Sequence, residues 1–309
     1  MIVAPRHPRR LVYLGTPEIA VPPLVALYEA GFNIELVVTR TDKRRGRGGQ
    51  LVPSPVKKAA LELGLPVTDD LWKVAALDVD LGVVVAYGRI IPTPILERLA
   101  MVNIHFSLLP RWRGAAPLER AILAGDKKTG VCLMEVAEEL DTGDLYDVRE
   151  LELGDKTLDQ LRSELVAMGS TMLVENLRDG LGAPVPQQGE VTYAKKIVVE
   201  EYQLDLSRSV VHLERVVRLG RAWTTFRGKR LKVLSARAEV SSPDAADAAN
   251  PAIAADAAVG AVGTLDGTTV IGIDGCLHLE TVQPEGRKAI DAASWRNGAQ
   301  PNSGEKLGS

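Results

Sequence analysis

Short apolar runs alternate with amphipathic stretches through the first half of this 309-residue chain. Each apolar run has the composition of a buried strand, and the two amphipathic stretches end at Gly31 and Gly64, as helices commonly do. The predicted strands are 11–14, 34–39, 66–67 and 81–86, and the predicted helices are 20–30 and 55–63. This succession predicts an α/β fold with a Rossmann-like, mostly parallel sheet covered by helices on both faces.

The rest of the chain completes this domain and predicts a second, smaller one. A strand at 103–107, a hairpin at 131–136 and 145–151, and a helix at 158–177 follow the first strands. Gly, Pro and Gln then accumulate, which indicates a linker at 184–204 between domains at 1–183 and 205–309. The second domain begins with a helix at 210–219, and its later strands predict a small β barrel or sheet. These strands are 229–236, 263–265, 268–273 and 276–282, and the Ala- and Asp-rich segment 241–260 is expected to be a long loop.

Composition excludes several classes of protein. Hydrophobic residues make up 46% of the chain and 37 basic residues oppose 40 acidic ones, which excludes disordered and collagen-like proteins. No apolar run approaches the roughly 18 residues of a membrane span, and no signal-peptide core follows the basic N-terminus. Cys132 and Cys276 are too far apart in sequence to indicate a disulfide framework or a zinc cluster. We expect a cytoplasmic protein that does not bind membranes.

Charge is concentrated in two basic segments. Residues 40–58 carry a net charge of +6 and residues 205–237 carry +7, so the remainder of this chain of net charge −3 carries −16. Such segments on an acidic protein could bind a polyanion through its phosphates. The alternative is a solvated loop and a solvated helix face.

A dinucleotide site is the first hypothesis to test for such a fold, and the sequence argues against it. The first predicted strand is followed by a single glycine, Gly15, where the dinucleotide fingerprint requires three. The second strand ends in Thr39-Arg40 and not in the acidic residue that holds a ribose. No P-loop and no paired His or Cys at metal-ligand spacing is present, so we expect no metal.

The strand at 103–107 carries the strongest candidate site. Alternation along a strand puts Asn103, His105 and Ser107 on one face, and Ile104 and Phe106 in the core. An amide and an imidazole at the end of such a strand can donate hydrogen bonds to a developing oxyanion, and the imidazole can also move a proton. The alternative is a structural histidine at the edge of the sheet.

Two loops could complete this site. Asp141, on the loop after the next strand, could orient or charge His105, although the segment Asp141-Thr142-Gly143 could equally be a polar hairpin turn. The loop at 109–117 is bounded by proline and glycine and contains Arg111, Trp112 and Arg113. Its aromatic and cationic groups could border a planar ligand or a nucleic acid, or could only brace the loop.

Together, Asn103-Ile104-His105, the loop at 107–117 and the segment at 140–144 resemble the formyltransferase family that uses 10-formyltetrahydrofolate. The resemblance extends over 11–196, includes 54–57 and 83–88, and continues more weakly to 289. It implies that Asn103, His105 and Asp141 are catalytic and that 10-formyltetrahydrofolate is the co-substrate. The folate contacts that it implies are Ser107, Leu108, Leu109, Pro110, Tyr87 and Gly88.

The resemblance is greatest to members of the family that formylate the α-amino group of initiator methionyl-tRNA. The segment 41–51 looks like a basic insertion that reaches the tRNA. The resemblance also implies that the second domain is an OB-like barrel with a basic surface. The tRNA contacts expected in the insertion are Arg40, Lys43, Arg44, Arg45 and Arg47. We expect a monomer. The alternatives are a formyltransferase acting on a small amine such as an amino sugar or ribonucleotide, a 10-formyltetrahydrofolate hydrolase, and a purely RNA-binding protein.

Overall fold

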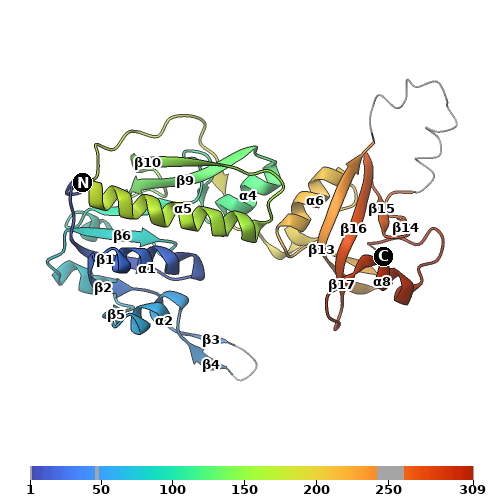
Figure 1. The fold of residues 1–309 in the computed structure, drawn as a ribbon, viewed down its shortest axis with the longest axis horizontal. Helices are drawn as coiled ribbons and strands as arrows, with labels where there is room; N and C mark the ends of the chain where they lie inside the picture. The colour runs from blue at the N-terminus through green and yellow to red at the C-terminus, as the bar shows by residue number, and fades with distance from the viewer. Residues whose placement is uncertain (1, 46–48, 242–260, 309) are drawn as a thin grey trace. The chain divides into compact units, whose positions relative to one another are not determined.

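The computed structural model describes residues 2–45, 49–241 and 261–308 (Figure 1). The chain forms two compact units. The first consists of Met1–Leu118, Lys127–Gly154 and Gln160–Lys195, and the second of Glu119–Asp126, Asp155–Asp159 and Lys196–Ser309.

A seven-stranded sheet forms the centre of the first unit. Its strands lie in the order β10-β9-β7-β6-β1-β2-β5, of which β1, β2, β5, β6 and β7 are parallel and β9 and β10 antiparallel. The strands are β1 (Arg10–Gly15), β2 (Asn33–Val38), β5 (Val67–Thr68), β6 (Leu81–Val85), β7 (Met101–His105), β9 (Lys128–Glu135) and β10 (Leu145–Glu152). The mostly parallel sheet predicted from the sequence is thereby confirmed.

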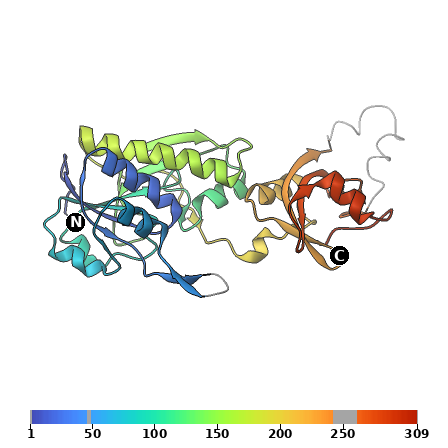
Figure 2. The same ribbon diagram turned by 60° about the horizontal axis from the view of Figure 1, so that its bottom comes forward.

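Helices cover both faces of this sheet. Figures 1 and 2 show α1 (Val21–Glu29) and α5 (Leu158–Asp179) side by side, and the carbonyl of Ala20, just before α1, accepts a hydrogen bond from the Tyr13 hydroxyl of β1. On the other face, apolar side chains of β1, β2, β6 and β7 share a core with η2 (Leu71–Ala76) and α3 (Thr93–Leu96). α2 (Pro55–Glu62) begins where the Ser54 hydroxyl accepts from the backbone N–H of Lys57.

The strand order creates a natural ligand-binding edge. β1 lies between β2 and β6, so successive strands are added in opposite directions from this point. In open α/β sheets, ligands bind at the carboxyl ends of the strands beside such a switch point. Here the Thr16 hydroxyl donates to the carbonyl of Tyr87 at 3.0 Å, which joins the segments that leave β1 and β6.

A small hairpin projects between β2 and α2. Its strands are β3 (Lys43–Arg45) and β4 (Gln50–Val52), which pair in antiparallel fashion. The sequence indicated a basic insertion here but gave no strand signal. Arg47, an expected tRNA contact, lies outside the described residues.

The second unit is built on an antiparallel sheet, as expected for the second domain. Its main strands are β12 (Trp223–Phe226), β13 (Lys229–Val240), β14 (Leu265–Asp266), β15 (Thr269–Ile271) and β16 (Gly275–Pro284), and β17 (Ile290–Asp291) pairs with β16. α6 (Val210–Arg218) and α8 (Ala292–Ala299) contribute Leu213, Val216 and Trp295 to its core. The sequence did not predict β12 or α8. Most of the loop expected at 241–260 lies outside the described residues.

None of the helices described between residues 2 and 308 combines the length and the apolar composition that a membrane span requires.

Candidate active site

β7 presents Asn103 and His105 on the same face of the sheet. Ile104, between them, is 2% exposed, whereas Asn103 is half-buried and its amide has no hydrogen-bond partner among the described residues. Ser107 does not continue this face, because β7 ends at His105. The Ser107 hydroxyl instead donates to the carbonyl of Arg111 at 2.6 Å and is buried. Of the three residues predicted to share this face, only Asn103 and His105 do so.

His105 and Asp141 lie together. The Nδ1 atom of His105 is 3.7 Å from Oδ2 of Asp141, and their side chains are only 7% and 12% exposed. The Nε2 atom of His105 is 3.0 Å from the carbonyl oxygen of Trp112. Because a carbonyl can only accept, Nε2 carries the hydrogen, and Nδ1 is the nitrogen that faces the carboxylate.

The backbone around Asp141 is specifically held. Asp141 adopts a left-handed φ of 53°, and its Oδ2 accepts the backbone N–H of Gly114 at 2.8 Å. Gly143 lies so close to the backbone of Glu135 that a Cβ atom there would collide with the Glu135 carbonyl oxygen. These contacts make the loop a built part of the site and not a freely moving turn.

The predicted folate loop packs against β9. Leu109 is buried with Cys132 and Met134, Pro110 is also buried, and Leu108 is half-buried. The Cys132 thiol donates to the carbonyl of Ser107, and burial raises the pKa of this thiol from 9.0 to about 11. The loop therefore lies on a buried apolar surface of low dielectric constant.

A segment from the predicted linker braces this loop, which the sequence did not indicate. β11 (Tyr193–Ala194) pairs in parallel with β8 (Arg113–Gly114), and the Thr192 hydroxyl accepts the backbone N–H of Trp112 at 2.9 Å. Gln187 reaches Asp141, Gly143 and Arg113. The Gly-, Pro- and Gln-rich composition of this segment carries no signal for these contacts.

Tyr87 and Gly88 follow β6 at the same edge of the sheet. Tyr87 is 1% exposed. Burial raises the pKa of this phenol, and the charges of Arg89 and Arg40 oppose the rise. The guanidinium of Arg40 lies beside Gly88, so this expected tRNA contact belongs to the sheet edge rather than to the hairpin.

Three of the other expected tRNA contacts lie on the hairpin. Lys43, Arg44 and Arg45 form β3, and the Arg44 guanidinium donates to the carbonyl of Gly49. At the base of the hairpin, Asp42 accepts two hydrogen bonds from Lys57 on α2, at 2.9 and 2.8 Å. This ion pair neutralises the single acid of the segment, so the hairpin presents positive charge.

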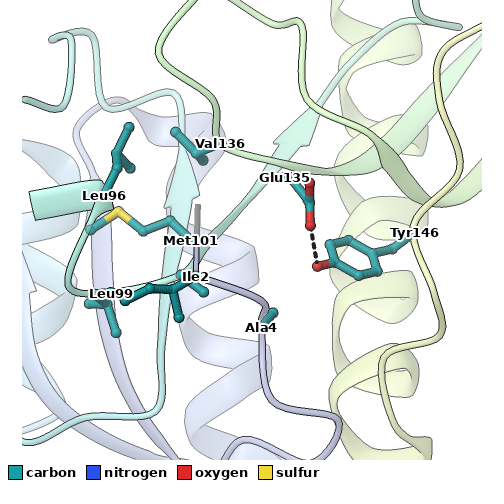
Figure 3. Close-up of a pocket in the computed structure, with 9 residues that line it drawn as sticks. Ile2, Ala4, Leu96, Leu99, Met101, Glu135, Val136 and Tyr146 are labelled. Carbon is teal, nitrogen blue, oxygen red and sulfur yellow. Dashed lines mark hydrogen bonds between the residues drawn. The ribbon is translucent and has the colours of Figure 1, made fainter. Parts of the chain in front are cut away.

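Two cavities share no lining residue with this site. The first, of about 10 Å³, is at the amino end of β7, where Figure 3 shows Met101 and Leu96 opposite the hydrogen-bonded pair Tyr146 and Glu135. It has room for about one water molecule. The second, of about 300 Å³, is in the second unit and is lined by Phe226, Trp295, Arg227, Lys229, Arg230 and Arg287, among others.

Comparisons with known proteins match both units. A formyl transferase family model matches residues 9–177, and a model of the formyl transferase C-terminal domain matches 196–300. A methionyl-tRNA formyltransferase of Methylococcus capsulatus is 40% identical over 318 residues, which cover 97% of this chain and 99% of that protein.

Solved structures share the fold at low identity. An N-formyltransferase from Helicobacter canadensis, in complex with folinic acid and dTDP-3-aminofucose, is 14% identical, with a TM-score of 0.63 over 89% of this chain and 99% of its own. HypX from Aquifex aeolicus, in complex with tetrahydrofolic acid, is 19% identical, with a TM-score of 0.58 over 97% of this chain and 49% of its own.

Proposed function

The chain belongs to the formyl transferase family, and we propose that it is a methionyl-tRNA formyltransferase. It transfers a formyl group from 10-formyltetrahydrofolate to the α-amino group of initiator methionyl-tRNA, for the start of translation. Residues 1–183 form the catalytic domain, 184–204 the connection, and 205–309 a tRNA-binding domain. We propose that it acts in the cytoplasm as a monomer. The observation that carries the proposal is the convergence of His105 and Asp141 beside Asn103.

The residues at the sheet edge suit a folate formyl donor. The half-buried Asn103 amide lacks a partner among the described residues and can bind the formyl oxygen. Tyr87 and Gly88 at the end of β6, with 107–110 after β7, would hold the pterin between the two strand ends. When bound, 10-formyltetrahydrofolate supplies an electrophilic formyl carbon.

Asn103 stabilises the charge that the reaction creates. The amine nitrogen of the acceptor bonds to the formyl carbon, the bond from that carbon to the folate nitrogen breaks, and one proton moves from the amine to the folate nitrogen. Negative charge develops on the formyl oxygen in the transition state. The Asn103 amide donates a hydrogen bond to this oxygen, and a preorganised donor of this kind acts more strongly in the transition state than in the ground state.

His105 and Asp141 handle the proton. Because Nε2 of His105 already donates to the Trp112 carbonyl, the imidazole accepts a proton at Nδ1. That proton then faces the Asp141 carboxylate, which stabilises the imidazolium. Because both ring nitrogens face protein groups, the amine's proton travels to and from the imidazole through water, and the positive charge that the ring gains adds to the stabilisation of the formyl oxygen.

The acceptor is assigned from the charge pattern and from the full-length relatives. Lys43, Arg44, Arg45 and Arg47 carry charge on the hairpin segment, and Arg40 lies at the sheet edge. In the second unit, Lys229, Arg230 and Arg287 line the 300 Å³ pocket. Neither of these basic surfaces is needed to bind a small amine acceptor, whereas the phosphates of a tRNA can bind to both.

The test is a direct assay of product. The protein is incubated with 10-formyltetrahydrofolate and methionyl-tRNA, and the RNA is examined for acid-stable formylmethionine. An amino-sugar nucleotide is supplied in a parallel reaction. Formate release without formylated RNA would identify a hydrolase, and formylation of the sugar alone would identify a small-amine formyltransferase.

A further inference from the structure

Gln187 joins the two backbone segments that hold the Asp141 carboxylate. Its Nε2 donates to the carbonyl oxygens of Asp141 and Gly143, at 2.9 and 2.8 Å. Its Oε1 accepts from Nε and Nη2 of Arg113, at 3.1 and 2.7 Å. One side-chain amide thus uses both of its donors on the Asp141 loop and its acceptor on β8.

We infer that Gln187 is a positioning residue for the reaction, which acts by fixing the carboxylate of Asp141 against His105. The inference rests on the proposed function, because it assigns Gln187 a role in that chemistry. Gln187 lies in a Gly-, Pro- and Gln-rich stretch of the first unit, and the composition of this stretch does not indicate such a role.

The Asp141 loop needs such a restraint. Asp141 has a left-handed φ of 53°, a conformation that is uncommon for residues other than glycine, although aspartate tolerates it better than most, and contacts with its surroundings help to hold it. Gln187 fixes the carbonyl of Asp141 itself and, two residues on, that of Gly143. With the direction of both peptides set, the Asp141 side chain is aimed at its two partners, the Gly114 N–H and the His105 ring.

The other end of the amide fixes the second anchor of the carboxylate. Arg113 immediately precedes Gly114, whose N–H donates to Asp141 Oδ2 at 2.8 Å. By accepting from the Arg113 guanidinium, Gln187 holds β8 at the same place as the loop. The link between the Asp141 loop and β8 therefore runs through two side chains, the amide of Gln187 and the guanidinium of Arg113.

Two substitutions separate the donor role from the acceptor role. Gln187→Glu keeps an oxygen for Arg113 and adds a charge that strengthens this contact, but it removes both N–H donors and points a carboxylate at two carbonyl oxygens. Gln187→Asn keeps the amide and is one methylene shorter, so it cannot span both anchors. The adjacent, exposed Gln188 provides matched controls, Gln188→Glu and Gln188→Asn.

Steady-state kinetics and thermal unfolding give the first readout. We expect both Gln187 variants to lose about 10- to 100-fold in kcat, the scale of a catalytic group displaced by about 1 Å, with KM for methionyl-tRNA within about twofold of wild type. Both Gln188 variants should match wild type. A kcat loss that only follows the fraction of folded protein, or a Gln187→Glu variant with wild-type kcat, would overturn the inference.

Amide hydrogen exchange gives a readout that needs no chemistry. The Gly114 N–H is protected by the Asp141 carboxylate, so its exchange should speed up in Gln187→Glu and stay unchanged in Gln188→Glu. Unchanged exchange in Gln187→Glu would overturn the inference. If the wild-type protein formylates no methionyl-tRNA while Gly114 exchange responds as expected, the proposed function fails and the placement of Asp141 by Gln187 stands.

Discussion

Nδ1 of His105 lies 3.7 Å from Oδ2 of Asp141, and the same carboxylate oxygen accepts the backbone N–H of Gly114 at 2.8 Å. The carboxylate is therefore anchored by the backbone independently of the histidine. The position of Asp141 therefore does not depend on the charge of His105.

Asp141→Asn should abolish most activity without disturbing the fold. An asparagine oxygen can still accept the Gly114 N–H, but it brings no negative charge to stabilise the imidazolium of His105. We expect kcat to fall by about 10²- to 10⁴-fold, the usual contribution of positioned acid–base groups, at nearly unchanged affinity for tetrahydrofolate. Glu139→Gln, at an exposed position on the same loop, is the control and should retain activity. A decrease in both variants alike would indicate that the general charge of the loop matters, and not the Asp141 pair.

Removal of the Asn103 donor should act on kcat. Both Asn103→Ala and Asn103→Asp eliminate the N–H group, and the aspartate keeps the size of the side chain. Loss of one preorganised donor typically costs about 2.7 to 4 kcal/mol, or roughly 100- to 1000-fold in rate. Single-turnover formylation with saturating substrates measures the chemical step. If the loss appears in KM alone, the amide binds substrate and does not stabilise the transition state.

A contact could be predicted from the sequence only where it follows from the local pattern of neighbouring residues. Asn103 and His105 share a face because alternation is a property of the strand itself, so the pattern alone places them together. Ser107 does not follow this alternation, because β7 ends at His105. The Ser107 hydroxyl instead donates to the carbonyl of Arg111 in the loop that follows the strand. Gln187 meets carbonyls 44 and 46 residues away, and its local composition encodes no such distant contact.

The Cys132 thiol should make stability depend on pH above 9. Burial raises its pKa in the folded protein from 9.0 to about 11, so the folded state keeps the proton after the unfolded chain has lost it. Its contribution to the unfolding free energy is constant below pH 9 and falls as pH rises toward 11, by at most about 1.4 kcal/mol per unit. Denaturant unfolding of wild type and Cys132→Ala between pH 8 and 10.5 measures the difference, and wild type should lose stability more steeply.

Cys276 provides the comparison for this measurement. It is less buried, and the rise in its pKa, caused first by burial and then by Glu239, is smaller than that of Cys132. Cys276→Ala should therefore change the pH slope less than Cys132→Ala. Equal slopes for wild type and Cys132→Ala would show that the thiol ionises alike in the folded and unfolded states.

The hairpin should bind tRNA through its charge, and salt dependence is the measurement that isolates this. Lys43 is exposed on β3, and Asp42, the one acid in the segment 40–58, is already paired with Lys57. Each cation that neutralises a phosphate releases condensed counterions, so Lys43→Ala should make the slope of log K against log salt concentration shallower by about 0.7 to 0.9. Arg47→Ala, outside the described residues, should do the same. Lys73→Ala, which removes an exposed lysine from η2 and lowers the net charge equally, should leave the slope unchanged. Because this control matches the total charge, an equal change in all three variants would assign the effect to the overall field of the protein and remove the hairpin from the interface.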